Sequence, residues 1–143
     1  MNRVRLTLPF PPTLNHNVGR NGARYYKNDD YRRFQRHVGW LWLKEAPPLW
    51  SLSKRYAVEI ELIYDSNRRY DVDNRVKPIL DALTVAGVWK DDSQVDMIAV
   101  FRGEIDKARP RANVTVVAYD KFDRFIRFIK KLFKVDNDDQ TFR

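Results

Sequence analysis

The sequence predicts an α+β domain in which helices pack on one mixed β-sheet. Two observations predict it. Several segments alternate apolar and polar residues, as half-buried strands do. Other segments repeat apolar residues every three or four positions, which is the spacing of an amphipathic helix. In chain order the elements are strand, loop, helix, strand, helix, strand and strand (β-loop-α-β-α-β-β), and this order favours a single mixed sheet with packed helices.

The strands are the segments with the clearest alternation. Four of them are predicted, at residues 3–9, 55–65, 95–103 and 112–119. The first strand is followed by a long loop rich in proline, asparagine and glycine, which includes a further short strand near residues 23–27. The sheet therefore uses segments from both ends of the domain.

Two helices are predicted between the strands. The first runs from Tyr31 to about Glu45, with a capping Asn or Asp just before it and aromatic residues on its buried face. The second covers about residues 74–86, with Gly87 as its C-terminal stop. Pro78 is tolerated because it lies within or just after the first turn of this helix.

The C-terminal segment differs in composition from the rest. Residues 1–119 form the predicted domain, and residues 120–143 are predicted as a basic amphipathic C-terminal helix that ends in a frayed tail. An apolar stripe from Phe122 to Phe133 is flanked by lysines and arginines. Such a helix docks on its own domain or on a partner chain, or it lies on a membrane surface or on DNA.

Composition excludes several classes of protein. The chain has 143 residues, 43% of them hydrophobic and 32% charged, as expected for one folded domain. It has no cysteine, which excludes disulfides and thiolate zinc sites and is compatible with the cytoplasm. No apolar run is long enough for a membrane span, and the N-terminus lacks the apolar core of a secretion signal. We therefore expect a cytoplasmic protein that binds no membrane and no small-molecule cofactor.

The net charge of +8 points to an anionic partner. The first forty residues contain eight lysines and arginines and only two acidic residues. Clustered cations of this kind bind the phosphates of nucleic acids, although a solvated basic surface is the alternative. The candidate DNA-binding residues are Arg20, Arg24 and Lys27 in the long loop, and Arg68 and Arg69 further along.

An acidic cluster interrupts this basic chain at RRYDVDNRVKPILDAL, residues 68–83. Asp71 and Asp73 are predicted to share one side of an extended segment, because side chains alternate along a strand. Paired carboxylates repel unless a cation neutralises them, and hard oxygen ligands suit Mg²⁺ or Mn²⁺. Helical spacing places Lys77 and Asp81 one and two turns beyond Asp73.

Simpler interpretations of the same residues remain open. Asp73 or Asn74 can be the N-cap of the second helix, and Asp73–Lys77 and Lys77–Asp81 can be ordinary surface ion pairs. The pair Asp91-Asp92 can fold back to add a third acidic ligand, or it can simply form a turn. A calcium loop of the EF-hand type is excluded, because Val76 occupies the position that requires glycine.

The run from residue 68 to residue 95 resembles the signature of the RusA family of Holliday junction resolvases. The shared elements are D-x-D-N, a lysine three residues after the asparagine, D-A-L, a glycine, and D-D-x-Q-V. In this chain they are Asp71, Asp73, Asn74, Lys77, Asp81-Ala82-Leu83, Gly87, Asp91-Asp92 and Gln94-Val95. The resemblance covers roughly residues 3–119 and leaves the C-terminal segment outside it.

The resemblance implies a site and an activity. It implies Mg²⁺ binding by Asp71, Asp73 and Asp92, with Mn²⁺ as a substitute, and a catalytic lysine at Lys77. Asn74, Asp81 and Asp91 would support these groups without carrying the chemistry. The implied protein is a homodimeric endonuclease of bacterial or phage origin that makes paired, symmetric nicks in four-way DNA junctions during recombination and repair.

Two other functions use the same features. A Mg²⁺-dependent nuclease for flaps or other branched DNA would need the same acidic cluster. A catalytically inactive junction-binding protein would need only the basic surface. Because a basic surface can hold DNA while an acidic cluster holds the metal that acts on it, we expect the enzyme.

Overall fold

Two β-sheets and two α-helices make up the fold of the computed structural model, which describes residues 2–13, 18–21, 24–27 and 29–120 together with Arg127 and Lys131. In chain order the elements are β1 (Asn2–Pro9), β2 (Val18–Asn21), β3 (Arg24–Lys27), α1 (Asp29–Glu45), β4 (Arg55–Ile63), the 3-10 helix η2 (Asp73–Arg75), α2 (Val76–Ala86), the 3-10 helix η3 (Asp92–Gln94), β5 (Val95–Arg102) and β6 (Arg111–Tyr119). The predicted α+β class is confirmed.

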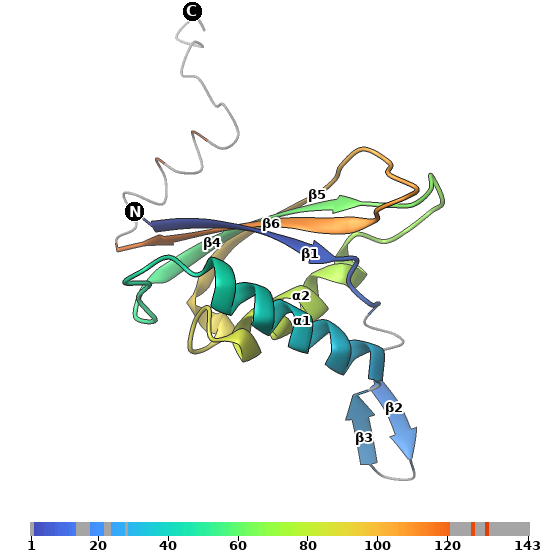
Figure 1. Cartoon of the computed structure of the whole chain (residues 1–143), viewed down its shortest axis with the longest axis horizontal. Helices are drawn as coiled ribbons and strands as arrows, with labels where there is room; N and C mark the ends of the chain where they lie inside the picture. Colours follow the sequence, from blue (N-terminus) through green and yellow to red (C-terminus); the bar gives the residue numbers. More distant parts are fainter. Residues whose placement is uncertain are drawn as a thin grey trace, which may run out of the picture.

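The main sheet has four strands in the order β1-β6-β4-β5. β6 is antiparallel to both of its neighbours, and β4 and β5 are parallel. The sheet is therefore mixed, as predicted. Both α-helices lie on one side of it, and the other side carries neither of them (Figure 1).

Alternation along the strands builds the core between this sheet and the helices. On β1, Val4, Leu6 and Leu8 are buried while the residues between them are exposed. The helices complete the core with side chains at helical spacing, of which Phe34 and Val38 of α1 are examples. Burial of these apolar side chains is the main contribution to stability.

The hairpin of β2 and β3 forms a separate small sheet. The sequence predicts only its second strand, near residues 23–27. It does not predict Val18–Asn21 as a strand, because the glycine and polar residues there show no alternation. In Figure 1 the hairpin projects from the N-terminal end of α1, away from the main sheet.

The predicted C-terminal helix lies almost entirely outside the described residues. Of residues 121–143 the structure describes only Arg127 and Lys131, both with helical backbone and exposed side chains. The docking of the apolar stripe thus remains a prediction. In the described part of the chain, no helix combines the length and apolar character needed to cross a bilayer.

Gly87 ends α2 as predicted. Its φ of 82° lies in the left-handed region, where a Cβ is unfavourable. Its N–H donates to the carbonyl oxygen of Thr84 at 3.0 Å, and the N–H of Val88 donates to that of Leu83 at 3.1 Å. This pair of bonds is the Schellman arrangement, and it turns the chain back toward the sheet.

Two glycine substitutions should therefore have opposite effects on the free energy of unfolding. Gly87→Ala should lower it by about 1 kcal/mol, because alanine is strained at positive φ. Gly39→Ala, inside α1, should raise it by about 0.5–1 kcal/mol, because the added Cβ meets no atom within 4 Å and alanine favours a helix. Urea unfolding of both variants measures the two changes, and equal changes would contradict the assigned helix end.

Candidate active site

The predicted catalytic residues all lie in one connection, between β4 and β5. Because these strands are parallel, the chain must cross from the carboxyl end of β4 to the amino end of β5, and α2 makes this crossover. Asp71 and Asp73 lie in the segment that follows β4. Lys77 and Asp81 lie on α2, and Asp92 is the first residue of η3, which leads into β5.

A layer of aromatic rings supports the segment that leads to the acidic residues. The ring of Tyr70 stacks on buried Tyr64 at 4.7 Å between centroids, and Phe10 meets Tyr64 edge to face at 5.1 Å. The guanidinium of Arg102 lies over Tyr64 at 5.1 Å and donates to the carbonyl oxygen of Tyr70. Arg75 lies over Phe10 at 4.7 Å. These two arginines therefore pack against the aromatic rings that support the acidic segment.

Asp71 and Asp73 are joined by a turn. Val72, between them, has φ −66° and ψ −33°, and η2 begins at Asp73, so the prediction of an extended segment is wrong. The turn forms because the helical path starts early, with the N–H of Arg75 donating to the carbonyl oxygen of Val72 at 3.3 Å. Asn74 links the two acids. Its Nδ2 donates to Asp71 Oδ2 at 3.4 Å and its backbone N–H to Asp73 Oδ1 at 3.0 Å.

The chemistry of these two carboxylates suits a hard cation. Both side chains are exposed, and neither forms an ion pair with a residue that the structure describes. Their oxygens, with the amide oxygen of Asn74 beside them, are the ligand type that Mg²⁺ prefers. Among the described residues, however, no three His, Cys, Asp or Glu side chains are grouped closely enough to hold a metal ion. Binding by Asp71, Asp73 and Asp92 together therefore stays a prediction.

Lys77 donates to the carboxylate of Asp81, which also accepts a hydrogen bond from α1. Its Nζ donates to Asp81 Oδ1 at 2.6 Å, and the hydroxyl of Tyr31 donates to Asp81 Oδ2 at 2.6 Å. The hydrogen bond to Asp81 raises the pKa of Lys77, and the charges of Asp81 and Asp92 add to this effect. Burial and the same carboxylate raise the pKa of Tyr31. At neutral pH the lysine is therefore a cation and the tyrosine a neutral donor.

The structure confirms one of the simpler interpretations of the acidic cluster and contradicts others. The Lys77–Asp81 surface pair is confirmed, with its partners at i and i+4 on α2. Asp73 and Lys77 form no ion pair in the described part of the chain. Neither Asp73 nor Asn74 caps α2, because that helix begins at Val76 and has no side-chain cap.

Asp91 and Gln94 fix the turn that presents Asp92. Asp91 Oδ1 accepts the N–H of Ser93 at 2.9 Å, and Gln94 Oε1 accepts the N–H of Asp91 at 3.1 Å. Hydrogen bonding by the side chain of Ser93, and then by its backbone N–H, lowers the pKa of Asp91. Gln94 Nε2 donates to the carbonyl oxygens of Leu52 and Lys54 at 2.9 Å each. The turn interpretation thus holds for Asp91.

Asp92, the next residue, is exposed and forms no ion pair within the described residues. It is close enough to Lys77 for its charge to raise the pKa of that lysine.

Two supporting residues are not predicted by the sequence. The helical spacing of Tyr31 indicates a core position and says nothing about a hydroxyl partner fifty residues away. Gln94 belongs to the motif, but the motif assigns it no role. The signal that could have identified it is the D-x-x-Q spacing of a capping box, which Asp91 and Gln94 form.

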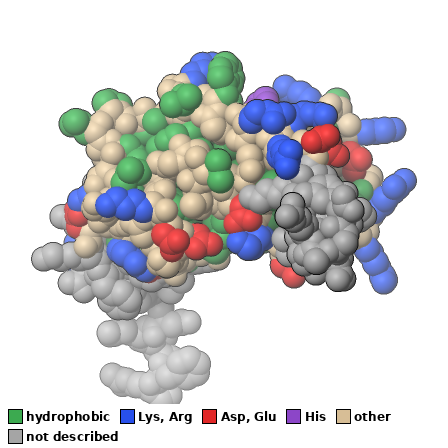
Figure 2. Space-filling view, turned by 90° about the horizontal axis from the view of Figure 1, so that it is seen from below, with side chains coloured by type: hydrophobic (Ala, Val, Ile, Leu, Met, Phe, Trp, Pro, Cys, Tyr) green, Lys and Arg blue, Asp and Glu red, His purple; other side chains and the backbone are tan. Residues whose placement is uncertain are grey.

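The candidate DNA-binding residues lie at two places. Arg68 and Arg69 are exposed in the segment before Asp71. Arg20 lies in β2 and Arg24 and Lys27 in β3, while their side chains are outside what the structure describes. Figure 2 shows basic side chains gathered at one end of the helix-covered face, with acidic side chains among them. This is the end at which the segment after β4 lies in Figure 1.

Known proteins match this chain over the region that contains the candidate site. A family model described as endodeoxyribonuclease RusA matches residues 9–117. The crossover junction endodeoxyribonuclease RusA of Enterobacteria phage HK97 is 36% identical over 103 residues, which are 72% of this chain and 85% of the relative. The protein of that name in Escherichia coli K12 is 35% identical over 107 residues, 75% of this chain and 88% of the relative. The one in Enterobacteria phage 82 is 34% identical over the same length.

The matched region includes the entire connection between β4 and β5, and it ends within β6, before the C-terminal segment. The acidic pair around Asn74 and the lysine beside it lie inside this region. The chain belongs to the RusA family of endodeoxyribonucleases.

Proposed function

We propose that this chain is a Mg²⁺-dependent endodeoxyribonuclease that resolves four-way DNA junctions as a homodimer. One observation carries the proposal: Asp71 and Asp73 both contact Asn74, with no ion pair to a described residue. They belong to the segment after β4, which lies at the end of the molecule where basic side chains gather (Figures 1 and 2). Two unpaired carboxylates on a DNA-attracting surface repel the substrate unless a cation joins them. Family membership supports this interpretation, because the relatives are named crossover junction endodeoxyribonucleases.

Asp71, Asp73 and Asp92 would hold the metal ion. When bound, Mg²⁺ would supply an activated water and would stabilise negative charge on the departing 3′ oxygen, and Mn²⁺ would substitute for it. Asn74 orients the first two carboxylates through its side chain and its backbone N–H. Asp91 does the same for Asp92 by fixing the turn that carries it.

Lys77 would act as a fixed positive charge beside these carboxylates. Its hydrogen bond to Asp81 keeps it protonated and limits its rotamers. From this position its ammonium can stabilise charge on the reacting phosphate or orient the attacking water. Asp81 does not contact the substrate in either role, and it positions the lysine.

The basic residues would bind the arms of the junction. Arg68 and Arg69 lie next to the acidic pair, so they would contact phosphates close to the cleaved bond. Arg20, Arg24 and Lys27 on the hairpin would contact an arm further away. A junction has approximate two-fold symmetry, and a dimer with C2 symmetry offers two equivalent sites for the two nicks. Because the proposed substrate is chromosomal or phage DNA, the enzyme would act in the bacterial cytoplasm.

Cleavage of a synthetic four-way junction tests the proposal directly. With Mg²⁺ we expect paired symmetric nicks in the junction and none in a linear duplex or a flap, and a chelator should abolish them. Equal cutting of all three substrates would indicate a general nuclease. Binding without nicks in either Mg²⁺ or Mn²⁺ would indicate a junction-binding protein that lacks catalysis.

Asp73→Asn should abolish cleavage and keep or tighten junction binding, because it removes a metal ligand and one negative charge. The matched control is Glu104→Gln, which removes one negative charge at an exposed position after β5. Cleavage rates and gel-shift affinities of the two variants make the comparison. A loss of binding by Asp73→Asn would indicate a folding role, and unchanged cleavage would remove Asp73 from the metal site.

Tyr31→Phe should slow cleavage by about tenfold without weakening junction binding, because Lys77 loses part of its orientation. It should also lower the free energy of unfolding by about 1 kcal/mol through the lost hydrogen bond. Tyr56→Phe is the matched control, since the hydroxyl of this buried tyrosine donates to the carbonyl oxygen of Ser51 at 2.5 Å. Equal kcat values in the two variants would show that Tyr31 acts on stability alone.

Arg20→Ala combined with Arg24→Ala should weaken junction binding and flatten its dependence on salt. Loss of two phosphate contacts should reduce the slope of log K against log salt by about 1.8. Lys44→Ala is the control, because this residue lies about 20 Å along α1 from Tyr31 and the site. An unchanged slope in the double variant would mean that the hairpin does not contact DNA.

A further inference from the structure

The face of the main sheet that neither α1 nor α2 covers has apolar side chains at one end. Its residues alternate with those of the core, and on β6 they include Val117 and Tyr119. Val117 pairs with Ala57 of β4, and Ala57 pairs with Met97 of β5. These three side chains form a row across the strands, which we call the apolar row. It lies at the end of the sheet where β6 ends.

Side chains at this end of the face are as buried as the core. Ala57 exposes 0% of its surface, and Val117 and Tyr119 expose 2% each. The hydroxyl of Tyr119 donates to Asp96 of β5, so its ring lies across the face. A sheet face that is open to water normally carries polar side chains and leaves large rings exposed. Some part of the molecule must therefore cover this end, and both α-helices lie on the other side of the sheet (Figure 1).

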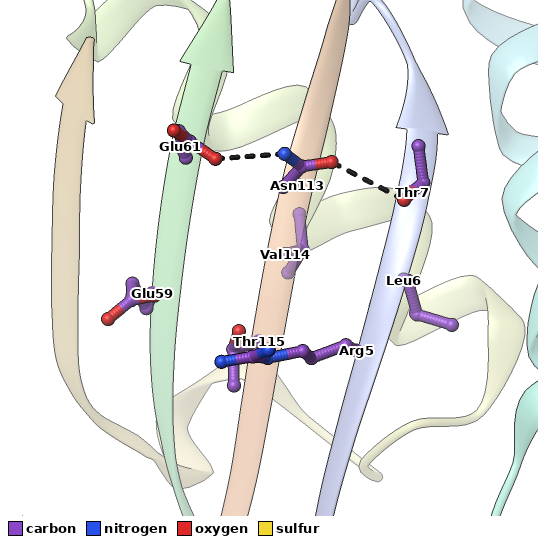
Figure 3. A pocket seen from close by; sticks show the side chains of 8 residues that line it. All are labelled: Arg5, Leu6, Thr7, Glu59, Glu61, Asn113, Val114 and Thr115. Carbon is purple, nitrogen blue, oxygen red and sulfur yellow. Dashed lines mark hydrogen bonds between the residues drawn. The ribbon is translucent and has the colours of Figure 1, made fainter. Parts of the chain in front are cut away.

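The adjoining rows of the same face are polar, which limits how far the cover extends. Asn113 Nδ2 donates to Glu61 Oε2 at 2.8 Å, and Thr7 Oγ1 donates to Asn113 Oδ1 at 3.3 Å (Figure 3). In the row between these residues and the apolar row, neither Arg5 nor Glu59 forms an ion pair with any residue that the structure describes. A cavity of about 300 Å³ lies over the two polar rows. Because burial of unpaired charges is costly, an apolar cover fits the apolar row and stops short of Glu59.

The chain leaves the sheet at the end that carries the apolar row. β6 ends at Tyr119, and the carboxylate of Asp120 forms an ion pair with Lys54, the residue directly before β4. The segment after residue 120 contains the apolar stripe from Phe122 to Phe133. As an α-helix this stripe would be about 18 Å long, and four strands span only about 14 Å. The segment therefore starts beside the apolar row and is long enough to cross it.

We propose that the C-terminal segment folds back within the same protomer and packs its apolar stripe on the apolar row. The two described residues of the segment support this orientation. Arg127 and Lys131 have helical backbone and exposed side chains, and a spacing of four places them on one side of a helix. At about 100° per residue, Phe125 and Ile129 of the stripe lie on the opposite side. Packing of the stripe therefore leaves both cations in water. The family model ends at residue 117, so this contact belongs to the chain beyond the matched region.

A second apolar surface lies at the same end of the molecule, on α1 and in the turn that follows it. Leu43 is 82% exposed and Leu49 is 94% exposed, so this surface is open in the structure. The apolar row, by contrast, is already buried. Burial thus favours the apolar row as the surface on which the stripe packs.

Thiol labelling tests the proposal in the full-length chain, because the chain has no cysteine of its own. Val117→Cys places a thiol on the apolar row, and Val116→Cys places one in the core, on the other face of the same strand. Ile129→Ser removes a large apolar side chain from the stripe, and Arg127→Ser is its matched control on the opposite side of the segment. Ile129→Ser should speed labelling of Val117→Cys about tenfold, because a weakened cover opens more often. Arg127→Ser should not change that rate, and neither serine should change the rate of Val116→Cys.

Four other results would each overturn the proposal. Fast labelling of Val117→Cys in the otherwise unaltered chain would mean that the face is open. Slow labelling that Ile129→Ser does not change would mean that another part of the chain covers the apolar row. Labelling that becomes faster when the protein is diluted would mean that a second copy provides the cover. Equal acceleration at Val116→Cys and Val117→Cys would mean that the substitution loosens the whole sheet. The measurement uses neither DNA nor metal, so its failure and that of the proposed nuclease are distinguishable.

Discussion

The parallel pairing of β4 and β5 is the constraint on which the candidate site depends. Antiparallel neighbours can be joined by a tight turn, but parallel neighbours need a crossover. In this chain the crossover contains the acidic turn, α2 and the loop before β5, so one connection supplies every residue proposed for chemistry. The rest of the sheet serves as a frame that fixes the two ends of this connection. Tyr64 and Arg102, at the ends of β4 and β5, extend that frame into the site.

The carboxylates of the site are of two kinds: some are engaged in contacts that hold the protein together, and others form no ion pair within the described residues. Asp81 accepts hydrogen bonds from a lysine and a tyrosine, so its charge is used within the protein. Asp91 is likewise used by the turn that it caps. Asp71, Asp73 and Asp92 are exposed and have no ion pair in the described part of the chain. Their charge is available to a cation, on a protein whose net charge of +8 otherwise attracts DNA.

Much of the fold was predictable from local sequence, and less of the way in which the site residues are held. The strands of the main sheet and both α-helices followed from periodicity, and Gly87 marked a helix end because a positive φ is a local property. The turn between Asp71 and Asp73 was missed, because D-x-D alternates as a strand would while η2 already begins at Asp73. The bond between Tyr31 and Asp81 joins α1 to α2, and no spacing rule within one helix can reveal it. The motif identified the family and indicated candidate site residues without showing how they are held.

The position of β6 has a consequence for how the chain is made. β6 is the last strand of the described residues, yet it lies inside the sheet and pairs with both β1 and β4. Asn2 pairs with Ala118, so β1 has no place in the sheet until almost the whole domain has been synthesised. The crossover, by contrast, closes over a short stretch of chain and can form early. A chain that stops before residue 111 would keep every proposed catalytic side chain and lack the strand that holds the frame together, so a ribosome that fails to finish this protein would release no active nuclease.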